Sequence, residues 1–296
     1  HDKSQASVPV YIGDSHDIES LVKITSLTKV ILTTVGPYSL HGKNLVAACI
    51  ETGTHYCDIT GEIPFVWDGI RKYNDKAVKA KVKIVHSCGF DSIPSDLGCL
   101  FLQEKAIHDT KHPCNKIRLY VDKIKGGISG GTLASMIDII ERSKDKRIRK
   151  ILSDPYALYP EGANSGIRQP RQNDIRWDKA IRNWTGPFIM SQFNSCIVRR
   201  SNALLNYIYG KDFTYDEVIV LSNNKLSLVR AKLWQIGLKV FAGLLYFPFM
   251  RFILLNTVLP RSGEGPSKKK REEGSFRLKL IGTLDKYKIS IQVSCD

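Results

Sequence analysis

The chain has 296 residues, which is enough for one large domain or two of ordinary size. Hydrophobic residues make up 43% and charged residues 25%, which is typical of a globular protein with a full core and argues against a disordered chain. The formal net charge of +15 favours an anionic partner: a nucleotide cofactor, a phospholipid surface or nucleic acid. The seven cysteines are odd in number and irregularly spaced, so they indicate buried thiols in a reducing compartment.

The first third of the chain alternates short apolar runs with helical segments. The expected order is a strand at 8–14, a helix capped by Ser15, a strand at 30–35, a helix at 45–50, a strand at 55–59, a helix at 63–81, a strand at 83–88 and a helix opened by Pro94. Short β-branched strands that alternate with helices predict a parallel sheet with crossover helices.

Three sharp loops follow the last three of these strands. They are Val35-Gly36-Pro37-Tyr38, then Asp58-Ile59-Thr60-Gly61-Glu62, and then residues 88–98, which begin Cys88-Gly89-Phe90-Asp91-Ser92. In open parallel sheets, ligands bind beyond the carboxyl ends of the strands, so function is expected at these loops. Each loop also has a purely structural interpretation, because Gly36 and Pro37 suit a turn, whereas Asp58, Glu62 and Ser92 can cap the helices that follow.

After about residue 110 the pattern changes. The sequence predicts a strand at 117–121, a Gly-rich turn at 126–131, a helix at 132–140, a basic and partly irregular insertion at 142–182, and antiparallel strands at 215–221 and 276–293. We therefore expect two domains, 1–112 and 113–296, the second with an α+β plan for substrate binding or dimerisation.

The segment 233–259 is the most apolar part of the chain, with a core from Val240 to Met250 that is too short to span a bilayer. Pro248 is expected to break a continuous helix there. Basic residues flank the core, which favours peripheral contact with a membrane or a lipid monolayer. A buried hairpin of helices and the wall of a lipid-binding pocket are the alternatives.

Several motifs are missing. No Gly-x-Gly-x-x-Gly follows an early strand, so the usual loop that cradles a pyrophosphate is absent from this chain. Both ends are expected to be cut from a longer chain, because the chain begins at His1 and a strand-like run at 288–293 stops abruptly. His108, His112 and Cys114 lack a fourth ligand with zinc-site spacing, so no metal is expected.

The three loop motifs, in this order and spacing, resemble the saccharopine dehydrogenase-like oxidoreductase family, which includes an animal lipid-droplet-associated protein and the bacterial trans-acting enoyl reductases. The stretches 195–200 and 263–276 also match, so the resemblance covers nearly the whole chain, although 142–182 matches poorly. It implies an α/β fold with a Rossmann-like parallel sheet, N-terminally truncated here, a second α+β domain truncated at its C-terminus, and NAD or NADP as cofactor. The choice between the two cofactors stays open.

The resemblance also implies a function and a site. The expected function is an NAD(P)-dependent oxidoreductase linked to lipid or glycolipid metabolism, with a small lipid-like substrate, no nucleic-acid partner and a homodimer as one assembly. The expected location is intracellular, at a lipid droplet or membrane, with the mitochondrion as a further compartment. Residues expected to bind the cofactor are Gly36, Pro37, Tyr38, Gly61, Cys88 and Gly89, and the catalytic candidates are Asp58, Glu62 and Asp91.

The alternative is a non-catalytic Rossmann scaffold at lipid droplets or membranes. It is favoured by the lack of an evident proton donor, such as a Tyr-x-x-x-Lys pair or a histidine in a strand-end loop. A cleft filled by side chains around the three carboxyl candidates would favour the scaffold, and an open apolar cleft beside the three loops would favour the enzyme.

Overall fold

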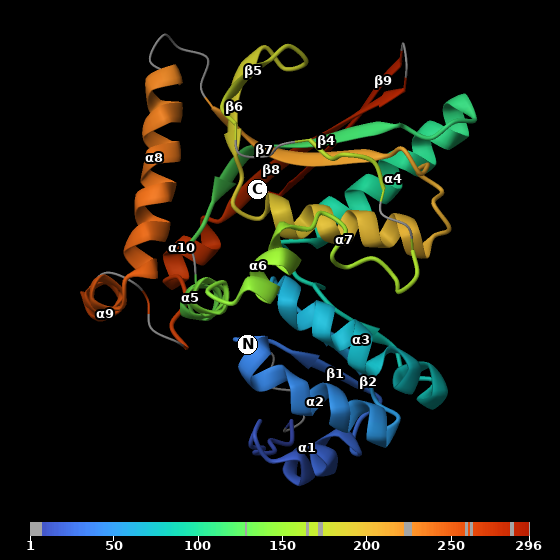
Figure 1. The fold of residues 1–296 in the computed structure, drawn as a ribbon, viewed down its shortest axis with the longest axis vertical. Coiled ribbons are helices and arrows are strands. Elements are labelled where there is room, and N and C mark those ends of the chain that lie inside the picture. Colours follow the sequence, from blue (N-terminus) through green and yellow to red (C-terminus); the bar gives the residue numbers. More distant parts are fainter. Residues whose placement is uncertain are drawn as a thin grey trace.

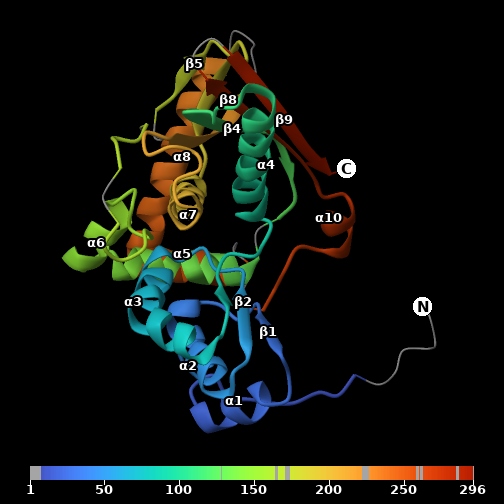
Figure 2. The same cartoon turned by 90° about the vertical axis from the view of Figure 1, so that its right-hand side faces the viewer.

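The computed structural model describes residues 8–127, 129–163, 166–170, 174–221, 227–257, 260, 263–284 and 287–295. Within these residues the chain folds into two β-sheets with helices packed on and between them (Figure 1, Figure 2). The first sheet is parallel and the second is mixed, which confirms the predicted α/β class with a second part built on a different plan.

The first sheet carries the three loops at one edge. Its strands are β1 (Val30–Thr33), β2 (His55–Asp58) and β3 (Ile84–Val85), in the order β1-β2-β3, and they are joined through α2 (Tyr38–Thr52) and α3 (Ile63–Ala80). The pairings of β1 with β2 and of β2 with β3 are both parallel. All three loops therefore leave the same edge of the sheet, as the sequence predicts. A short helix, α1 (Ile18–Thr25), packs against α2.

Local sequence explains where these helices end. α2 stops at Gly53, whose φ of 72° is the left-handed conformation that glycine adopts at little cost. α3 has Pro64 in its first turn, where no intrahelical N–H bond is lost, and ends at Lys81 with φ of 55°. Both ends match the predicted boundaries.

Two predictions at the N-terminal end were wrong. Residues 8–14 form no strand, because a strand needs a hydrogen-bonded neighbour and none of the described strands pairs with them. The cap of α1 is Asp17, which accepts a hydrogen bond from the N–H of Glu19, whereas Oγ of Ser15 lies 3.3 Å from Nδ1 of His41.

The strand expected at 83–88 is only two residues long. Ser87 has a φ of 64°, which no strand residue adopts, and its N–H donates to Oδ1 of Asp58. His86 therefore lies in the loop after β3 and not inside a strand. The statement that no strand-end loop holds a histidine was wrong for this reason.

The second sheet has six strands in the order β5-β6-β7-β4-β8-β9. They are β4 (Lys116–Lys125), β5 (Arg176–Asp178), β6 (Asn183–Pro187), β7 (Thr214–Leu221), β8 (Ser275–Leu284) and β9 (Tyr287–Cys295). The prediction of purely antiparallel strands was wrong in one place, since β7 is antiparallel to β6 but parallel to β4. The long connection from β4 to β7 contains several helices, which gives the chain the length that a parallel crossover needs.

Helices cover the second sheet and separate it from the first. α4 (Ile93–Thr110) and α7 (Ser191–Leu204) pack against each other and against β7, β8 and β9. α5 (Gly130–Arg142) crosses between the two sheets, and α6 (Lys146–Ser153) packs against α3 (Figure 2). The domain boundary at 112–113 stays a prediction.

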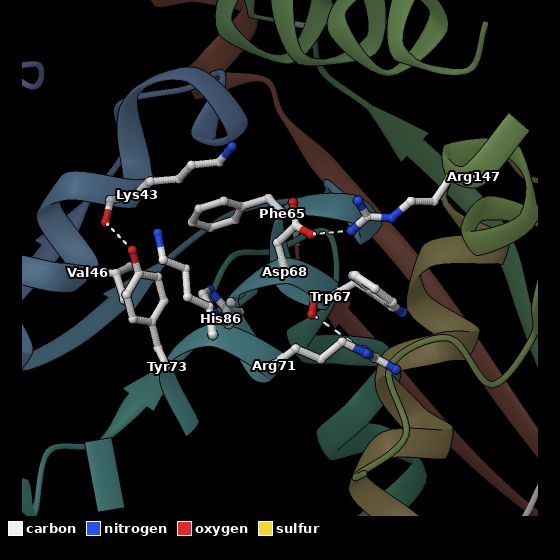
Figure 3. Close-up of a pocket in the computed structure, with 11 residues that line it drawn as sticks. Lys43, Val46, Phe65, Trp67, Asp68, Arg71, Tyr73, His86 and Arg147 are labelled. Atoms are coloured by element: carbon white, nitrogen blue, oxygen red, sulfur yellow. Dashed lines mark hydrogen bonds and ion pairs between the residues drawn. The ribbon is translucent and has the colours of Figure 1, made fainter. Parts of the chain in front are cut away.

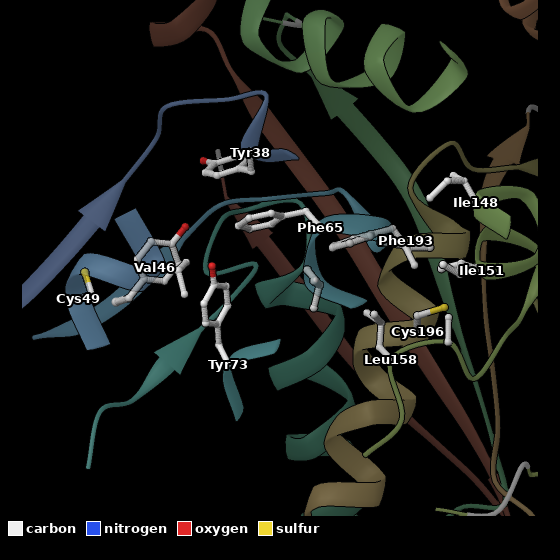
Figure 4. Close-up of a cluster of buried hydrophobic side chains, with 14 residues drawn as sticks. Tyr38, Val46, Cys49, Phe65, Tyr73, Ile148, Ile151, Leu158, Phe193 and Cys196 are labelled. Atoms are coloured by element: carbon white, nitrogen blue, oxygen red, sulfur yellow. The ribbon is translucent and has the colours of Figure 1, made fainter. Parts of the chain in front are cut away.

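The hydrophobic core continues from one sheet to the other. Figure 4 shows Phe65 of α3 near Tyr38 of α2 and Phe193 of α7, in a cluster that also contains Ile148 and Ile151 of α6. A second cluster lies between α4, α7 and the second sheet and is centred on the buried side chains of Leu102, Leu119 and Leu280. The first cluster takes residues both from the half of the molecule with the first sheet and from the half with the second sheet. Burial of apolar surface therefore holds the edge with the three loops against the second half.

The predicted hydrophobic segment forms α8 (Ser227–Tyr246) and α9 (Pro248–Thr257), and its last residues, 258 and 259, lie outside the described part. The helix breaks at Pro248, as predicted, and the two parts are bent by 106°. Among the described residues, no single helix is long and apolar enough to cross a membrane; this bent pair passes that test only when both parts are taken together.

Candidate functional site

The carboxylate of Glu62, in the loop after β2, closes the N-terminus of α2. Its Oε1 accepts a hydrogen bond of 2.8 Å from the N–H of Tyr38, and its Oε2 accepts one of 2.8 Å from the N–H of Ser39. Oγ of Ser135, on α5, donates to Oε1 at 2.7 Å. A negative charge at this position is stabilised by the partial positive charge of the helix end. Glu62 therefore occupies the place where a helix N-terminus could otherwise bind a phosphate.

Asp58 holds the loops after β2 and β3 together. Its Oδ1 accepts from the N–H groups of Thr60 (3.0 Å) and Ser87 (2.9 Å). Its Oδ2 accepts from the hydroxyl of Tyr56 at 2.9 Å and lies 2.6 Å from Nδ1 of His86. Burial, together with the nearby carboxylate, raises the pKa of Tyr56, so this hydroxyl stays protonated and keeps donating.

Accessibility separates the three carboxyl candidates. Asp58 is 0% and Glu62 is 1% exposed, and the oxygens of both are engaged by protein donors. Asp91 is exposed on the third loop, and partial desolvation by the surrounding chain raises the pKa of its carboxyl. The space around Asp58 and Glu62 is thus filled, and Asp91 is the one exposed residue among the three candidates.

The polar residues of the third loop bind α7. Ser92 occupies the N-cap position of α4, as predicted, but its hydroxyl makes no capping bond and donates instead to Oδ1 of Asn194 at 3.0 Å. Oγ of Ser201 donates to Oδ2 of Asp96 at 3.0 Å, and Nδ2 of Asn194 donates to Oε2 of Glu217 on β7 at 3.0 Å. These bonds fix the start of α4 on the second half of the molecule.

The six residues expected to bind the cofactor fall into two groups. Pro37 and Tyr38 are buried, and the Tyr38 hydroxyl, whose pKa burial raises to about 12, donates to the carbonyl of Thr33. The partly exposed group at the edge of the sheet consists of Gly36, Gly61, Cys88 and Gly89. The two buried residues therefore set the shape of the first loop, and the four partly exposed residues are accessible from solvent.

The surface beside these partly exposed residues is apolar. Val35 is 57%, Ile59 is 42% and Phe90 is 46% exposed, one from each loop. Glycine lets a ligand approach the backbone closely, and apolar side chains suit a neutral ring or an acyl chain. The structure thus brings Gly36, Gly61, Cys88 and Gly89 to one edge of the sheet beside three exposed apolar side chains, and their role in binding the cofactor stays a prediction.

His86 is the site residue that sequence reasoning missed. Its side chain is 12% exposed, and its ring makes edge contacts with Phe65 and Tyr56, at centroid distances of 5.3 and 5.8 Å. The bond from Nδ1 to Asp58 fixes the ring and leaves Nε2 as its other nitrogen. The Ser-Cys-Gly that follows His86 was the available sign that the strand ends early.

The described residues contain no group of three or more His, Cys, Asp or Glu side chains placed to hold a metal ion. Cys114 is buried in the core, whereas His108 is exposed and lies against Asp109. The His-x-x-x-His-x-Cys pattern is therefore spread between the core and the surface.

No protein-family model matches the chain. A trans-acting enoyl reductase of Mycobacterium tuberculosis is 34% identical over 289 residues, which cover 94% of this chain and 69% of that protein. The trans-acting enoyl reductase of Mycobacterium ulcerans is 34% identical over 290 residues, which cover 93% and 68%. A second Mycobacterium tuberculosis protein, provisionally named for the same activity, is 36% identical over 292 residues, which cover 95% and 69%.

Among solved structures, the apo histidine-tagged saccharopine dehydrogenase (L-Glu forming) of Saccharomyces cerevisiae is similar over 38% of this chain and 24% of that chain. The sequence identity is 21% and the TM-score is 0.31, a likeness too small to support any statement about the site. The family assignment therefore depends on the bacterial relatives, which match this chain along nearly its whole length. On that basis, the chain belongs to the family of trans-acting enoyl reductases.

Proposed function

We propose that the chain is an NAD(P)-dependent oxidoreductase that reduces an activated carbon–carbon double bond in a lipid-like substrate. The observation that carries this proposal is the edge formed by the three loops, where partly exposed glycines lie beside Val35, Ile59 and Phe90. The names of the relatives give the reaction class, and the apolar edge suits both a nicotinamide ring and an acyl chain.

In a reduction of this class, one carbon of the double bond gains a hydride and the other gains a proton, while the reduced nicotinamide supplies the hydride and becomes oxidised. The chain's own contribution is position and exclusion of water. Gly36, Gly61 and Gly89 allow close approach to the backbone, and the exposed apolar side chains would cover a bound ring and keep water from it. We assign Asp91 as the candidate proton donor, because its carboxyl is exposed and its pKa is raised.

Isothermal titration of the full-length protein with NADPH and with NADH tests the cofactor. Consumption of the bound reduced cofactor in the presence of a medium-chain enoyl thioester tests the reaction. Asp91→Asn is expected to slow turnover at least tenfold and to leave cofactor affinity within twofold, since it removes a proton and not a binding surface. If neither dinucleotide binds, the oxidoreductase proposal is wrong.

The buried carboxylates of Asp58 and Glu62 favour the alternative, a non-catalytic scaffold at a lipid surface. Its supporting feature is the α8–α9 pair, where Leu233 is 62%, Phe249 is 73% and Phe252 is 68% exposed. Exposed apolar helices with basic neighbours suit peripheral attachment to a lipid surface, and the enzyme could use the same attachment to reach a lipid substrate.

Flotation with anionic liposomes and with isolated lipid droplets tests the attachment. Co-flotation together with dinucleotide binding is expected for an enzyme that works at a lipid surface. Co-flotation with no binding of NADPH or NADH would support the non-catalytic scaffold. A protein that stays at the bottom of the gradient would contradict the proposed attachment to a lipid surface.

A further inference from the structure

A pocket of about 420 Å³ opens between α2, α3 and α6 (Figure 3). Its lining contains none of the residues expected to bind the cofactor. The residues that carry the argument are Lys43 of α2, Trp67, Arg71 and Lys72 of α3, Arg147 of α6, and His86. The volume lies in the range of small-molecule sites, about 300–1,000 Å³.

The lining of the pocket is strongly cationic. Among the described residues that line it, four are basic (Lys43, Arg71, Lys72 and Arg147) and a single one, Asp68, carries a carboxylate. Only Arg147 pairs with it, at 3.3 Å, and in the described part of the chain neither lysine has a carboxylate within ion-pair distance. Crowding like charges around one concave surface is unfavourable by itself, so an anion that enters would relieve it.

Two of these cations are held in place. The guanidinium of Arg71 lies 3.7 Å from the centroid of the Trp67 ring and also donates to the Trp67 carbonyl at 3.4 Å. The guanidinium of Arg147 lies 5.0 Å from the same ring centroid. Both arginines are exposed residues, so their contacts with the Trp67 ring are what orient them. Two guanidinium groups beside one indole place two sets of paired N–H donors next to each other. Such bidentate donors suit the oxygens of a phosphate.

The wall of the pocket allows access to His86. Gly69 lies in the middle of α3, and a Cβ atom at this position would be 3.5 Å from Nε2 of His86. The glycine keeps that side of the imidazole free of a side chain. A hydrogen-bonding ring nitrogen thus borders the same space as the four basic side chains.

We propose that this pocket binds a small ligand that carries one or more phosphate groups. The phosphate oxygens would lie between Arg71 and Arg147, with the ammonium groups of Lys43 and Lys72 as further partners. Four basic groups against one carboxylate match a ligand with two or more negative charges better than a single carboxylate. The inference does not depend on the proposed oxidoreductase activity, because none of the four basic side chains is assigned to the cofactor or to the reaction.

Inorganic pyrophosphate is the probe for a free phosphate, and vesicles that contain phosphatidic acid are the probe for a phosphate on a lipid headgroup. The test uses the full-length protein and compares Arg147→Gln with Arg149→Gln. Arg149 is an exposed arginine on the same helix, it does not line the pocket, and its substitution removes the same charge. Thermal midpoints of both variants show that each is folded.

We expect pyrophosphate to bind with a stoichiometry of one, to bind less tightly at higher salt, and to lose at least tenfold in affinity in Arg147→Gln while Arg149→Gln stays within twofold. If pyrophosphate does not bind but Arg147→Gln alone loses binding to the vesicles, the phosphate belongs to a lipid. Equal losses in the two variants, or no binding of either probe, would overturn the proposal.

Discussion

Nδ1 of His86 lies 2.6 Å from Oδ2 of Asp58, and this contact joins the loop after β3 to the loop after β2. The same carboxylate receives the N–H of Ser87, and the carbonyl of Asp58 receives the N–H of Cys88. Asp58 therefore sets the path of the chain from β3 into the third loop. Asp58, a catalytic candidate from the sequence, is buried and positions both loops, and its catalytic role stays a prediction.

Asp58→Asn is expected to destabilise the protein by about 1–3 kcal/mol, because an amide cannot accept from all four of the donors that surround the buried carboxylate. The midpoint of urea unfolding measures the change. Asp75→Asn, an exposed site on α3, is the matched control and is expected to change stability by less than about 0.5 kcal/mol. Equal midpoints in the two variants would show that the hydrogen bonds of the Asp58 carboxylate are not important for stability.

Glu62→Gln is expected to lower stability by about 1–3 kcal/mol, since it removes the charge at the start of α2 and presents an N–H₂ group to one of three donors. Ser135→Ala removes only the bond from α5 and should cost about 1 kcal/mol. Urea unfolding of both variants and of Glu51→Gln, an exposed residue near the end of α2, gives the comparison. A larger loss in Ser135→Ala than in Glu62→Gln would contradict this account.

The sequence predicts the first sheet well because its signals are local. Apolar runs, Gly53 at the end of α2 and Pro64 at the start of α3 place the elements to within a few residues, and right-handed crossovers bring the three loops to one edge. The break at Pro248 is predicted for the same reason, because a ring without an N–H acts on its own helix.

The parts that sequence reasoning misses depend on distant partners. Glu62 and Tyr38 are 24 positions apart, and Ser135 is 73 positions from Glu62, so no local pattern shows that they bond to one another. Ser92 has the composition of a cap, yet Asn194, 102 positions away, receives its hydroxyl. Residues 8–14 have the composition of a strand, and none of the described strands pairs with them.

Two desolvated carboxyls, Glu217 on β7 and Asp96 on α4, make stability depend on pH. Glu217 is fully buried, and burial raises its pKa from 4.5 to about 7. Because the folded protein holds this proton more tightly than the unfolded chain, the group's stabilising contribution is complete below pH 4.5 and is lost as the pH rises to about 7. Asp96, with its pKa raised to about 6, acts in the same direction.

Glu217→Gln replaces the ionisable group by a permanently neutral one. We compare the free energy of unfolding of this variant with that of the original protein. From the acidic to the neutral end of this pH window, the difference is expected to shift in favour of the variant by about 1–3 kcal/mol. Thermal midpoints measured on both sides check this, with Glu104→Gln, exposed on α4, as the control. A difference that does not change with pH would mean that Glu217 keeps an ordinary pKa.

Gly61→Ala tests the edge that we assign to the cofactor. The new Cβ atom would lie 3.3 Å from Cε of Met190, the flexible end of a side chain, so stability should change by less than about 1 kcal/mol. The added methyl group would stand where a ligand approaches the backbone, and NADPH affinity is expected to fall at least fivefold. Gly243→Ala on α8, where a Cβ atom meets nothing within 4 Å, is the control. Unchanged titration curves for Gly61→Ala would exclude this glycine from the cofactor surface.

The α8–α9 pair provides the test of attachment to lipid. Arg251 of α9 pairs with Glu141 of α5 at 2.6 Å, which anchors the base of α9 while Phe249 and Phe252 stay exposed. If these rings enter a lipid surface, each contributes about 1.5–3 kcal/mol of transfer free energy. The double substitution Phe249→Ser and Phe252→Ser should therefore weaken binding to anionic vesicles more than tenfold, and the thermal midpoint shows that the variant is folded.

Phe101→Ser is the matched control for this double substitution, because Phe101 is 61% exposed on α4, outside the bent pair. It is expected to leave flotation unchanged, since its ring belongs to a different surface. Raising the salt concentration should weaken the part of the binding that comes from the exposed side chains of Lys232 and Lys239 and leave the part that comes from the two phenylalanine rings. An equal loss of flotation in Phe101→Ser and in the double variant would show that general surface hydrophobicity, and not this pair of helices, holds the protein to lipid.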